Sequence, residues 1–548
     1  MLFWMFLGCT GEEAPCAEGY GRTGDGDCVP LDGGDDSGPG GDGGVDSDSG
    51  GGGDDTQPVE ALLEGEVIAC DAPDDELRYT ESAASMGLRG PASPEDEHPE
   101  WGSGAVFDAD GDGDLDVVLA WPSEPPVLFE RVGDGFEERA LPGPDHPWQL
   151  SLGDLDGDGD LDLVVTGFEY ADGTSSQGVV LVNDGGTFSL GDTLPVPDEG
   201  LVREVALGDL DLDGDLDGWA VVTSREHEQN AVDMLLLNDG SGGFSASTPI
   251  AADVAGGKGF DAQWFDVDAD ADLDLYVVND FGPDLGGNVL YVNEGGTLAD
   301  GRDDCSCGLE HAGMGVAVGD QNLDGQPDLF LTDGEANKLI QALDDHSYVD
   351  VTLSTGANQL QSVSEMAWGA HFVDHDHDGR MDVLVAVGDL WGEDKIYTDV
   401  ETTPEGDHSV SLLGGTETGT FIERRDERGL ALLGSWRAVV ADDHNGDGTP
   451  DLLVIDVAGQ PALWLSDSCT AGSWVEVAAP AGSRVEATAG GTTFTGWASH
   501  DSGSGGARAS VVHLGLGQAD TADVRVVVPG GQVYTADGVA TRQRLSTP

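Results

Sequence analysis

Asp108-Ala-Asp110-Gly-Asp112-Gly-Asp114-Leu-Asp116 is the first copy of a pattern, Asp-x-Asp/Asn-x-Asp-Gly-x-x-Asp, that recurs along the 548-residue chain. The seven copies begin at Asp108, Asp154, Asp209, Asp266, Asp320, Asp374 and Asp443, so successive copies lie 46, 55, 57, 54, 54 and 69 residues apart. Self-similarity at a nearly fixed period is the sequence signature of a repeat architecture. The chain is therefore predicted to contain seven related units.

The residue types of the pattern suit a calcium ion. Ca²⁺ takes six to eight oxygen ligands, and alternate residues of a tight loop can direct carboxylates inward from positions 1, 3 and 5. Glycine at position 6 permits the sharp turn, because it adopts positive φ without a steric penalty. Position 7 would offer its backbone carbonyl, and position 9 is a carboxylate in every copy. We therefore expect up to seven calcium ions.

The candidate metal ligands are the residues at positions 1, 3, 5, 7 and 9 of each copy. In the first four copies all are aspartates: Asp108, Asp110, Asp112, Asp114, Asp116; Asp154, Asp156, Asp158, Asp160, Asp162; Asp209, Asp211, Asp213, Asp215, Asp217; and Asp266, Asp268, Asp270, Asp272, Asp274. The last three copies supply Asp320, Asn322, Asp324, Gln326, Asp328; Asp374, Asp376, Asp378, Arg380, Asp382; and Asp443, Asn445, Asp447, Thr449, Asp451. Ala271 replaces the turn glycine in the fourth copy, and two asparagines replace carboxylates, so we expect these loops to bind more weakly than the first three.

The segments that flank the loops are typical of buried strands. Val117-Val-Leu119 follows the first loop and Gly315-Val-Ala-Val-Gly319 precedes the fifth, and both are short, apolar and β-rich. An EF-hand loop would close with Glu at position 12 and lie between helices, so EF-hand and dockerin folds are disfavoured. The repeat length fits a four-stranded propeller blade. We predict an all-β fold, a seven-bladed β-propeller with calcium-binding loops, plus a small C-terminal β domain.

Two resemblances to known families support this prediction. The loops, with segments such as Asn288-Val-Leu-Tyr-Val-Asn-Glu-Gly-Gly296, resemble the FG-GAP/VCBS repeats of integrin-α-type propellers over roughly residues 75–470. From Ser473 onward, Gly482-Ser-Arg-Val485, His513-Leu-Gly-Leu-Gly517 and Val524-Arg-Val-Val-Val-Pro-Gly-Gly531 resemble the ASPIC/UnbV domain of the cartilage-acidic-protein family. The resemblance implies no catalytic role for that domain.

Ring closure is expected to use the N-terminal part of the propeller. Leu77-Arg-Tyr-Thr-Glu-Ser82 precedes the first loop and has no loop of its own, which makes it the candidate outer strand of the seventh blade. Cys70 and Cys469 would then meet across the closure as a disulfide, or remain two unrelated thiols. Cys305 and Cys307 either form a small-ring disulfide or stay free, and Cys16 with Cys28 is the natural local pair.

Two histidines lie within the sixth loop. His375 and His377 alternate with its aspartates, a composition that suggests zinc. They occupy positions 2 and 4, however, which should point away from the ion. We therefore expect both imidazoles to face solvent.

The domain organisation follows from composition. The apolar run that ends at Cys9 resembles a bacterial lipobox, so residues 1–9 are a candidate lipoprotein signal remnant with Cys9 as lipid anchor. Residues 10–57 are rich in Gly, Asp and Ser and are predicted to be a disordered tether. The propeller is expected over residues 58–471 and the ASPIC/UnbV-like domain over 472–548.

Charge and residue usage narrow the function. The chain has 107 acidic and 21 basic residues and a formal net charge of −86, so we expect no nucleic-acid partner, and anionic membrane surfaces are poor partners as well. An enzyme on this frame would need an insertion that brings Arg, Lys, Tyr or His toward the axis, and basic residues are scarce. We therefore predict an extracellular or cell-surface, monomeric adhesion, ligand-binding or scaffold module for a protein or glycan, with an outer-membrane lipoprotein as one form. The alternative is a secreted polysaccharide lyase or hydrolase.

Overall fold

The computed structural model describes residues 20–22, 28–30, 59–70, 77–91, 102–168, 176–195, 200–223, 232–247, 257–282, 286–334, 336–343, 346–358, 366–388, 408–456, 460–500 and 503–548. The chain divides into two compact units, Met1–Asp55 and Thr56–Pro548. In the first unit, β1 (Tyr20–Arg22) pairs antiparallel with β2 (Cys28–Pro30), so the predicted tether contains a small sheet. Cys9 and Cys16 lie outside the described residues, and with them the predicted anchor and the Cys16–Cys28 pair.

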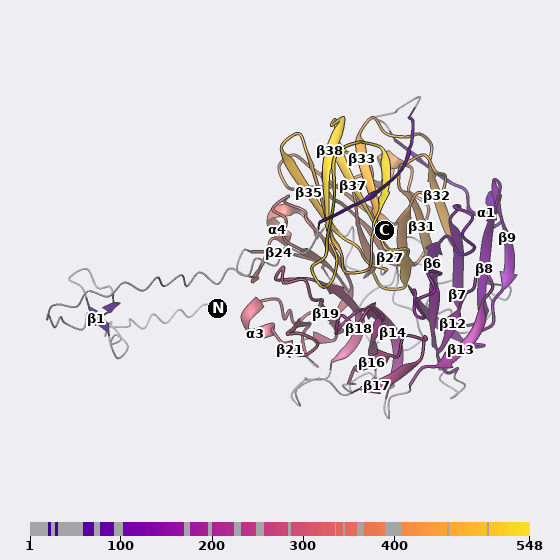
Figure 1. The fold of residues 1–548 in the computed structure, drawn as a ribbon, viewed down its shortest axis with the longest axis horizontal. Coiled ribbons are helices and arrows are strands. Elements are labelled where there is room, and N and C mark those ends of the chain that lie inside the picture. Colours follow the sequence, from indigo (N-terminus) through magenta and orange to yellow (C-terminus); the bar gives the residue numbers. More distant parts are fainter. Residues whose placement is uncertain are drawn as a thin grey trace, which may run out of the picture. The chain divides into compact units, whose positions relative to one another are not determined.

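Seven sheets with four antiparallel strands side by side make up most of the described part of the second unit (Figure 1). The first three sheets are β6 (Ser103–Phe107), β7 (Asp116–Trp121), β8 (Glu124–Val132), β9 (Gly135–Ala140); β10 (Pro147–Gly153), β11 (Asp162–Gly167), β12 (Val179–Val182), β13 (Ser189–Thr193); and β14 (Leu201–Gly208), β15 (Asp217–Thr223), β16 (Met234–Asn238), β17 (Phe244–Ser247). The next three are β18 (Lys258–Phe265), β19 (Asp274–Asp280), β20 (Val289–Asn293), β21 (Leu298–Asp300); β22 (Gly313–Gly319), β23 (Asp328–Asp333), β24 (Lys338–Ala342), β25 (Tyr348–Asp350); and β26 (Met366–Val373), β27 (Asp382–Gly388), β28 (Ser411–Gly415), β29 (Phe421–Glu423).

The sheets are arranged as in a β-propeller. The first strand of each sheet contacts the first strand of the next, from β6 through β10, β14, β18, β22 and β26 to β30, and β30 contacts β6 again. These first strands are mainly buried, and hydrophobic side chains of neighbouring sheets pack between them. The predicted all-β class is confirmed.

The seventh sheet combines the two ends of the repeat region. Its strands are β30 (Trp436–Asp442), β31 (Asp451–Asp456), β32 (Pro461–Ser466) and β5 (Tyr79–Glu81), and β5 pairs antiparallel with β32. The phenol of Tyr79 is buried and donates a hydrogen bond of 3.1 Å to the carbonyl of Pro450. The sequence prediction that residues 77–82 supply this outer strand is confirmed.

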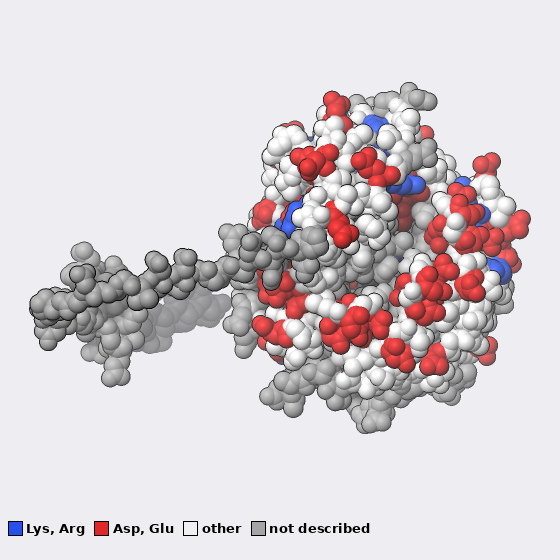
Figure 2. Space-filling view, viewed as in Figure 1, with Lys and Arg blue, Asp and Glu red and all other residues white. Residues whose placement is uncertain are grey.

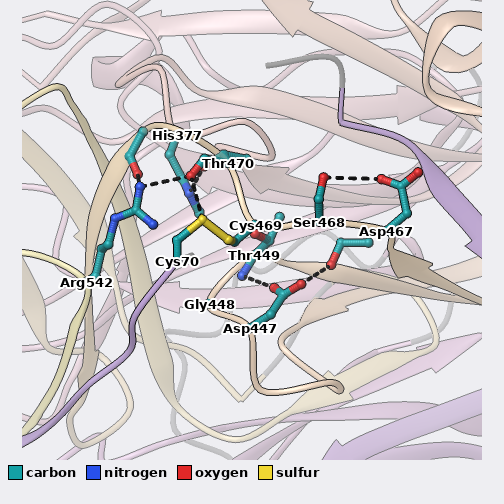
Figure 3. Close-up of a disulfide and its surroundings, with 12 residues drawn as sticks. Cys70, His377, Asp447, Gly448, Thr449, Asp467, Ser468, Cys469, Thr470 and Arg542 are labelled. Atoms are coloured by element: carbon teal, nitrogen blue, oxygen red, sulfur yellow. Dashed lines mark hydrogen bonds between the residues drawn. A yellow bond between two sulfur atoms is a disulfide. The ribbon is translucent and has the colours of Figure 1, made fainter. Parts of the chain in front are cut away.

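A disulfide joins Cys70 to Cys469 beside this closure (Figure 3). The pair was one of two alternatives in the sequence, and the structure selects it. A second disulfide joins Cys305 to Cys307, both of which are buried.

The C-terminal domain consists of two sheets around one hydrophobic core. One sheet has the order β37 (Val511–Gly517), β33 (Ser473–Ala478), β40 (Gln543–Ser546), β4 (Leu63–Val67). The other has the order β3 (Glu60–Ala61), β39 (Val533–Ala540), β38 (Thr521–Val527), β34 (Arg484–Ala489), β35 (Thr492–Trp497). Residues 60–67 therefore belong to this domain and not to the propeller, because β3 and β4 pair with β39 and β40.

One strand of the C-terminal region enters the ring. β36 (Gly506–Arg508) pairs parallel with β6 and also contacts β10 and β30, which are innermost strands of their sheets. The Ser103 hydroxyl donates a hydrogen bond of 2.8 Å to the carbonyl of Gly505 just before it.

The described helices are short: α1 (Ala83–Met86), α3 (Arg302–Cys305), α4 (Thr352–Thr355) and α5 (Arg425–Arg428), each of which follows the outer strand of a sheet. In the part of the chain that the structure describes, no helix is long and apolar enough to cross a membrane.

Candidate metal centres

Each acidic loop connects the first and second strands of its sheet, and its first aspartate organises the backbone. In the first loop, the N–H groups of Gly111 and Gly113 donate to the two carboxylate oxygens of Asp108 at 2.8 and 2.9 Å. The N–H of position 6 makes the same contact with position 1 in all seven loops. The position-1 carboxylate is thus held in place by its own loop.

The aspartate at position 9 has a structural role that sequence reasoning missed. One of its oxygens accepts a backbone N–H from the third strand or the segment around it, as Asp116 does from Arg131 at 2.6 Å and Asp162 from Asn183 at 2.8 Å. All seven loops share this bond. The hydrogen bond of the position-9 carboxylate therefore connects the loop to the third strand of its sheet or to the segment around that strand.

The backbone of each loop is left-handed at positions 4 and 6. Position 6 was expected, but position 4 was not, because its residue is glycine in only three copies. Leu212, Ala269, Leu323 and His377 have φ values of 60°, 63°, 59° and 56° there. At position 6 of the fourth loop, Ala271 keeps the turn with φ of 74°.

The loops bring their carboxylates together. Ligand atoms lie within 4.8 Å of one another in the sets Asp108, Asp110, Asp116; Asp154, Asp156, Asp162; Asp266, Asp268, Asp274; and Asp209, Asp211, Asp213. Positions 1, 3 and 9 thus converge in the first, second and fourth loops, and positions 1, 3 and 5 in the third. These acidic clusters can hold metal ions.

The carboxylate at position 5 accepts a backbone hydrogen bond from its own loop. Its carboxylate accepts the N–H of position 7 in every loop, for example from Asp114 to Asp112 at 2.9 Å. Position 7 itself contributes to the neighbouring turn in two loops, where Asp160 and Asp272 accept the N–H groups of Gly185 and Gly295 at 2.7 and 3.0 Å.

Without a cation, the clusters are electrostatically unfavourable. Burial and, to a smaller extent, the neighbouring carboxylates together raise the pKa of Asp116, Asp162 and Asp217 to about 6, although backbone hydrogen bonds lower it. The same causes raise the pKa of Asp274 to about 8. A bound cation would offset both the burial and the repulsion.

Several loop oxygens are buried without a hydrogen-bond donor in the described structure. They are Oδ1 of Asp156, Oδ1 of Asp209, Oδ2 of Asp217, Oδ1 of Asp268 and Oδ1 of Asp272. Buried polar atoms without a partner are rare in native proteins, and one explanation is an ion. All-oxygen donor sets of this kind fit a hard divalent cation.

The loops differ in how far they are covered. Most residues of the first three loops are exposed or half-buried, and acidic side chains gather on this face over the right and lower parts of the ring (Figure 2). The C-terminal domain packs on the later loops. The N–H of Gly530 donates to the carbonyl of Ala271 at 2.8 Å, and that of Gly517 to the carbonyl of His377 at 3.2 Å.

The prediction that His375 and His377 face solvent is wrong. Both residues are 1% exposed: His375 lies at position 2, which is buried in most of the loops, and His377 packs against Trp474 and His513 of the C-terminal domain. His375 Nδ1 contacts a carboxylate oxygen of Asp382, and the ligand atoms of His375, Asp376 and Asp382 lie within 4.8 Å of one another. The ring of His377 stacks on that of His513, and their Nε2 atoms lie 2.8 Å apart.

The fifth loop differs in its third position. The Asn322 amide donates a hydrogen bond of 2.7 Å to Asp324. Burial raises the pKa of Asp320 to about 6 and that of Asp328 to about 8. The cluster resembles the first four in lacking a paired Lys, Arg or His among the described residues.

Known proteins offer three further findings. No curated protein sequence matches the chain. Among solved structures, BBS1N in complex with ARL6DN is similar at 10% identity and a TM-score of 0.37, covering 74% of this chain and 97% of that chain. YCF48 from Cyanidioschyzon merolae is similar at 13% identity and a TM-score of 0.40, covering 71% and 98%. At these scores the similarities say nothing about function.

Family models match two regions that the sequence had singled out. The FG-GAP-like repeat matches residues 108–165, 266–331 and 320–385, which include acidic loops and the strands around them. The ASPIC and UnbV model matches residues 478–547, within the C-terminal domain. The chain is thus a β-propeller protein with FG-GAP-like repeats and a C-terminal ASPIC and UnbV domain.

Proposed function

We propose that this protein is an extracellular calcium-binding propeller that serves as an adhesion, ligand-binding or scaffold module, and that it is not an enzyme. The observation that carries the proposal is the group of buried carboxylate oxygens without donors in the repeated acidic loops. FG-GAP-like repeats on a propeller are in keeping with a binding or scaffold role.

Calcium is proposed because the convergent donors are carboxylates. Three aspartates converge in each of the first four loops, and backbone carbonyls and water can complete the six to eight ligands that Ca²⁺ takes. The smaller Mg²⁺ demands a near-ideal octahedron and keeps its water, so a protein cage of several carboxylates favours calcium.

The partner is proposed to be a protein or a glycan that binds the outer surface of the ring. β36 and the residues just before it pack against the innermost strands, so the C-terminal region fills part of the axis. A formal net charge of −86 disfavours nucleic acid and anionic membranes. We propose a monomeric protein, since one chain closes the seventh sheet with its own strand.

An extracellular location is proposed from the two disulfides, Cys70–Cys469 and Cys305–Cys307, because disulfides persist in oxidising compartments. Attachment to a membrane through a lipid on Cys9 is part of this proposal.

Calcium removal tests the proposal. At a free concentration ten times the dissociation constant, one site contributes about 1.4 kcal/mol, so the first four loops together would contribute on the order of 6 kcal/mol. The melting temperature should fall in excess chelator and recover with calcium but not with equal magnesium. An unchanged melting temperature, together with no calcium bound at equilibrium dialysis, would refute the metal role.

The binding role needs a separate measurement. A glycan array and a pull-down from extracellular material, each run with and without calcium, should yield calcium-dependent ligands. Turnover of a polysaccharide by the purified chain, in lyase and hydrolase assays, would replace the binding proposal by the enzymatic alternative.

A further inference from the structure

A positively charged side chain from outside the seventh acidic loop contacts the first aspartate of that loop. Arg544, on β40 of the C-terminal domain, places Nη2 2.9 Å from Oδ2 of Asp443, the first aspartate of the loop. Its Nε lies 2.9 Å from Oε1 of Glu476 on β33. The side chain of Asp443 is 1% exposed and that of Arg544 is 40% exposed, so the guanidinium reaches from the surface to a buried carboxylate.

Other acids of this loop also meet protein donors. The hydroxyl of Ser466 donates a hydrogen bond of 2.9 Å to Oδ2 of Asp447. The side-chain amide of Asn445, at position 3, donates to the same serine at 3.0 Å and, over 3.4 Å, to Asp451. The groups that would bind a cation at positions 1, 5 and 9 are therefore satisfied by the chain itself.

The sixth loop is compensated in the same way. Arg428 on α5 places Nη2 2.8 Å from Oδ2 of Asp376, and Arg380 lies 3.2 Å from Asp378. His375 Nδ1 contacts a carboxylate oxygen of Asp382. Three of the four side-chain acids of the loop thus have a basic partner.

The first five loops show the opposite arrangement. Among the described residues, their aspartates form no ion pair with Lys, Arg or His within 4.0 Å. The buried carboxylate oxygens of the loops that have no donor belong to the second, third and fourth loops, while in the seventh loop the hydroxyl of Thr449 is buried without a partner. Arg544 belongs to the C-terminal domain and Arg428 to α5, and the C-terminal domain also contacts the fourth loop, where the N–H of Gly530 donates to the carbonyl of Ala271.

We propose that Arg544 takes the place of the metal ion in the seventh loop, and that this loop is a metal-independent lock between the propeller and the C-terminal domain. With the sixth loop compensated likewise, the protein binds metal in its first five loops at most. The expected number of ions rests on the proposed function, because it assumes that the other acidic loops bind calcium. A divalent ion beside the guanidinium would be repelled, and binding would require Arg544 to leave two buried acids, Asp443 and Glu476.

The ion count is the first test, with calcium measured by equilibrium dialysis on the full chain. Five ions or fewer are expected in the wild type. Asp154→Ala, at position 1 of the second loop, should lower the count by one, whereas Asp443→Ala, at the same position of the seventh loop, should leave it unchanged. Six or seven ions in the wild type, or a loss of one ion in Asp443→Ala, would overturn the inference.

The second test uses stability and does not depend on calcium binding. In excess chelator, Arg544→Gln should lower the melting temperature by roughly 3–5 °C, since a buried acid loses its partner. Adding Asp443→Asn should restore most of the loss. The matched control is Arg525→Gln in the same domain, whose ion pair with Glu486 is more exposed at 46% and 20%, and it should shift the melting temperature little.

The two tests separate this inference from the proposed function. A wild type that binds no calcium would refute the proposed function, but the shifts of Arg544→Gln in chelator would still decide the role of the arginine. If Arg544→Gln melts like the parent in chelator, or if Arg525→Gln loses as much, Arg544 does not take the place of the ion.

Discussion

Removal of the Cys70–Cys469 disulfide should destabilise the protein by several kcal/mol, because this single covalent bond closes a very long loop of the chain. The two cysteines are 399 residues apart, and the chain-entropy relation for a loop of that length gives about 6 kcal/mol. Both side chains are half-buried, so alanine at both positions leaves little unfilled space. The Cys70→Ala/Cys469→Ala variant should therefore lose several kcal/mol, mainly because its unfolded chain gains freedom.

The matched comparison is Cys305→Ala/Cys307→Ala. Those cysteines are 2 residues apart, and the same relation gives the cross-link only about 1–2 kcal/mol, to which lost packing at two buried sites adds. Urea unfolding followed by tryptophan fluorescence would compare both variants with the parent, with m-values checked for extra transitions. Equal losses in the two variants, or a Cys70→Ala/Cys469→Ala midpoint equal to that of the parent, would refute the argument that the long loop is what matters.

Two further predictions concern the turn of the fourth loop and a buried histidine. Ala271→Gly should stabilise the protein by about 1 kcal/mol, because alanine is strained at φ of 74°. The opposite substitution in the third loop, Gly214→Ala at φ of 98°, should destabilise it by a similar amount. Equal melting temperatures for the two variants and the parent would contradict this. Burial lowers the pKa of His500 to about 4, so the unfolded state binds the proton first and stability should fall as the pH drops from about 6.5 to 4, by at most about 3 kcal/mol. His500→Gln should lose less stability than the parent between pH 7 and pH 4.5 in urea titrations, and an identical loss would assign the acid sensitivity to other groups.

The sequence predicted the parts of the fold that are encoded locally. The period of the aspartates located each loop to the residue, since a tight turn between two buried strands has a fixed length. The outer strand at Tyr79 could be predicted as well, because the first loop is preceded by a strand pattern that has no loop of its own. The left-handed residue at position 4 escaped notice because Leu212 and Leu323 give no local sign of it.

What the sequence could not show is which loops the second domain covers. His377 stands at a position that is exposed or half-buried in the other copies, and the packing of β33 and β37 on the sixth loop explains its burial, whereas His375 stands at position 2, which is buried in most copies. The pairing of Arg544 with Asp443, 101 residues apart, and of β3 with β39 likewise depends on tertiary contacts. Local patterns therefore identified the candidate ligands, while domain packing decides which of them remain available.

The N-terminal strands β4 and β5 pair with strands that are synthesised much later, so part of the fold has to form late in translation. β5 leaves the ribosome long before its partner β32, which follows about 380 residues later, and β40 follows its partner β4 at a still greater separation. At typical translation rates of 5–20 residues per second, β5 waits about 20–80 s with an unpaired edge. The seventh sheet cannot be completed before β32 is made, nor the C-terminal domain before β40, so the nascent chain carries strand edges open to wrong partners during these intervals.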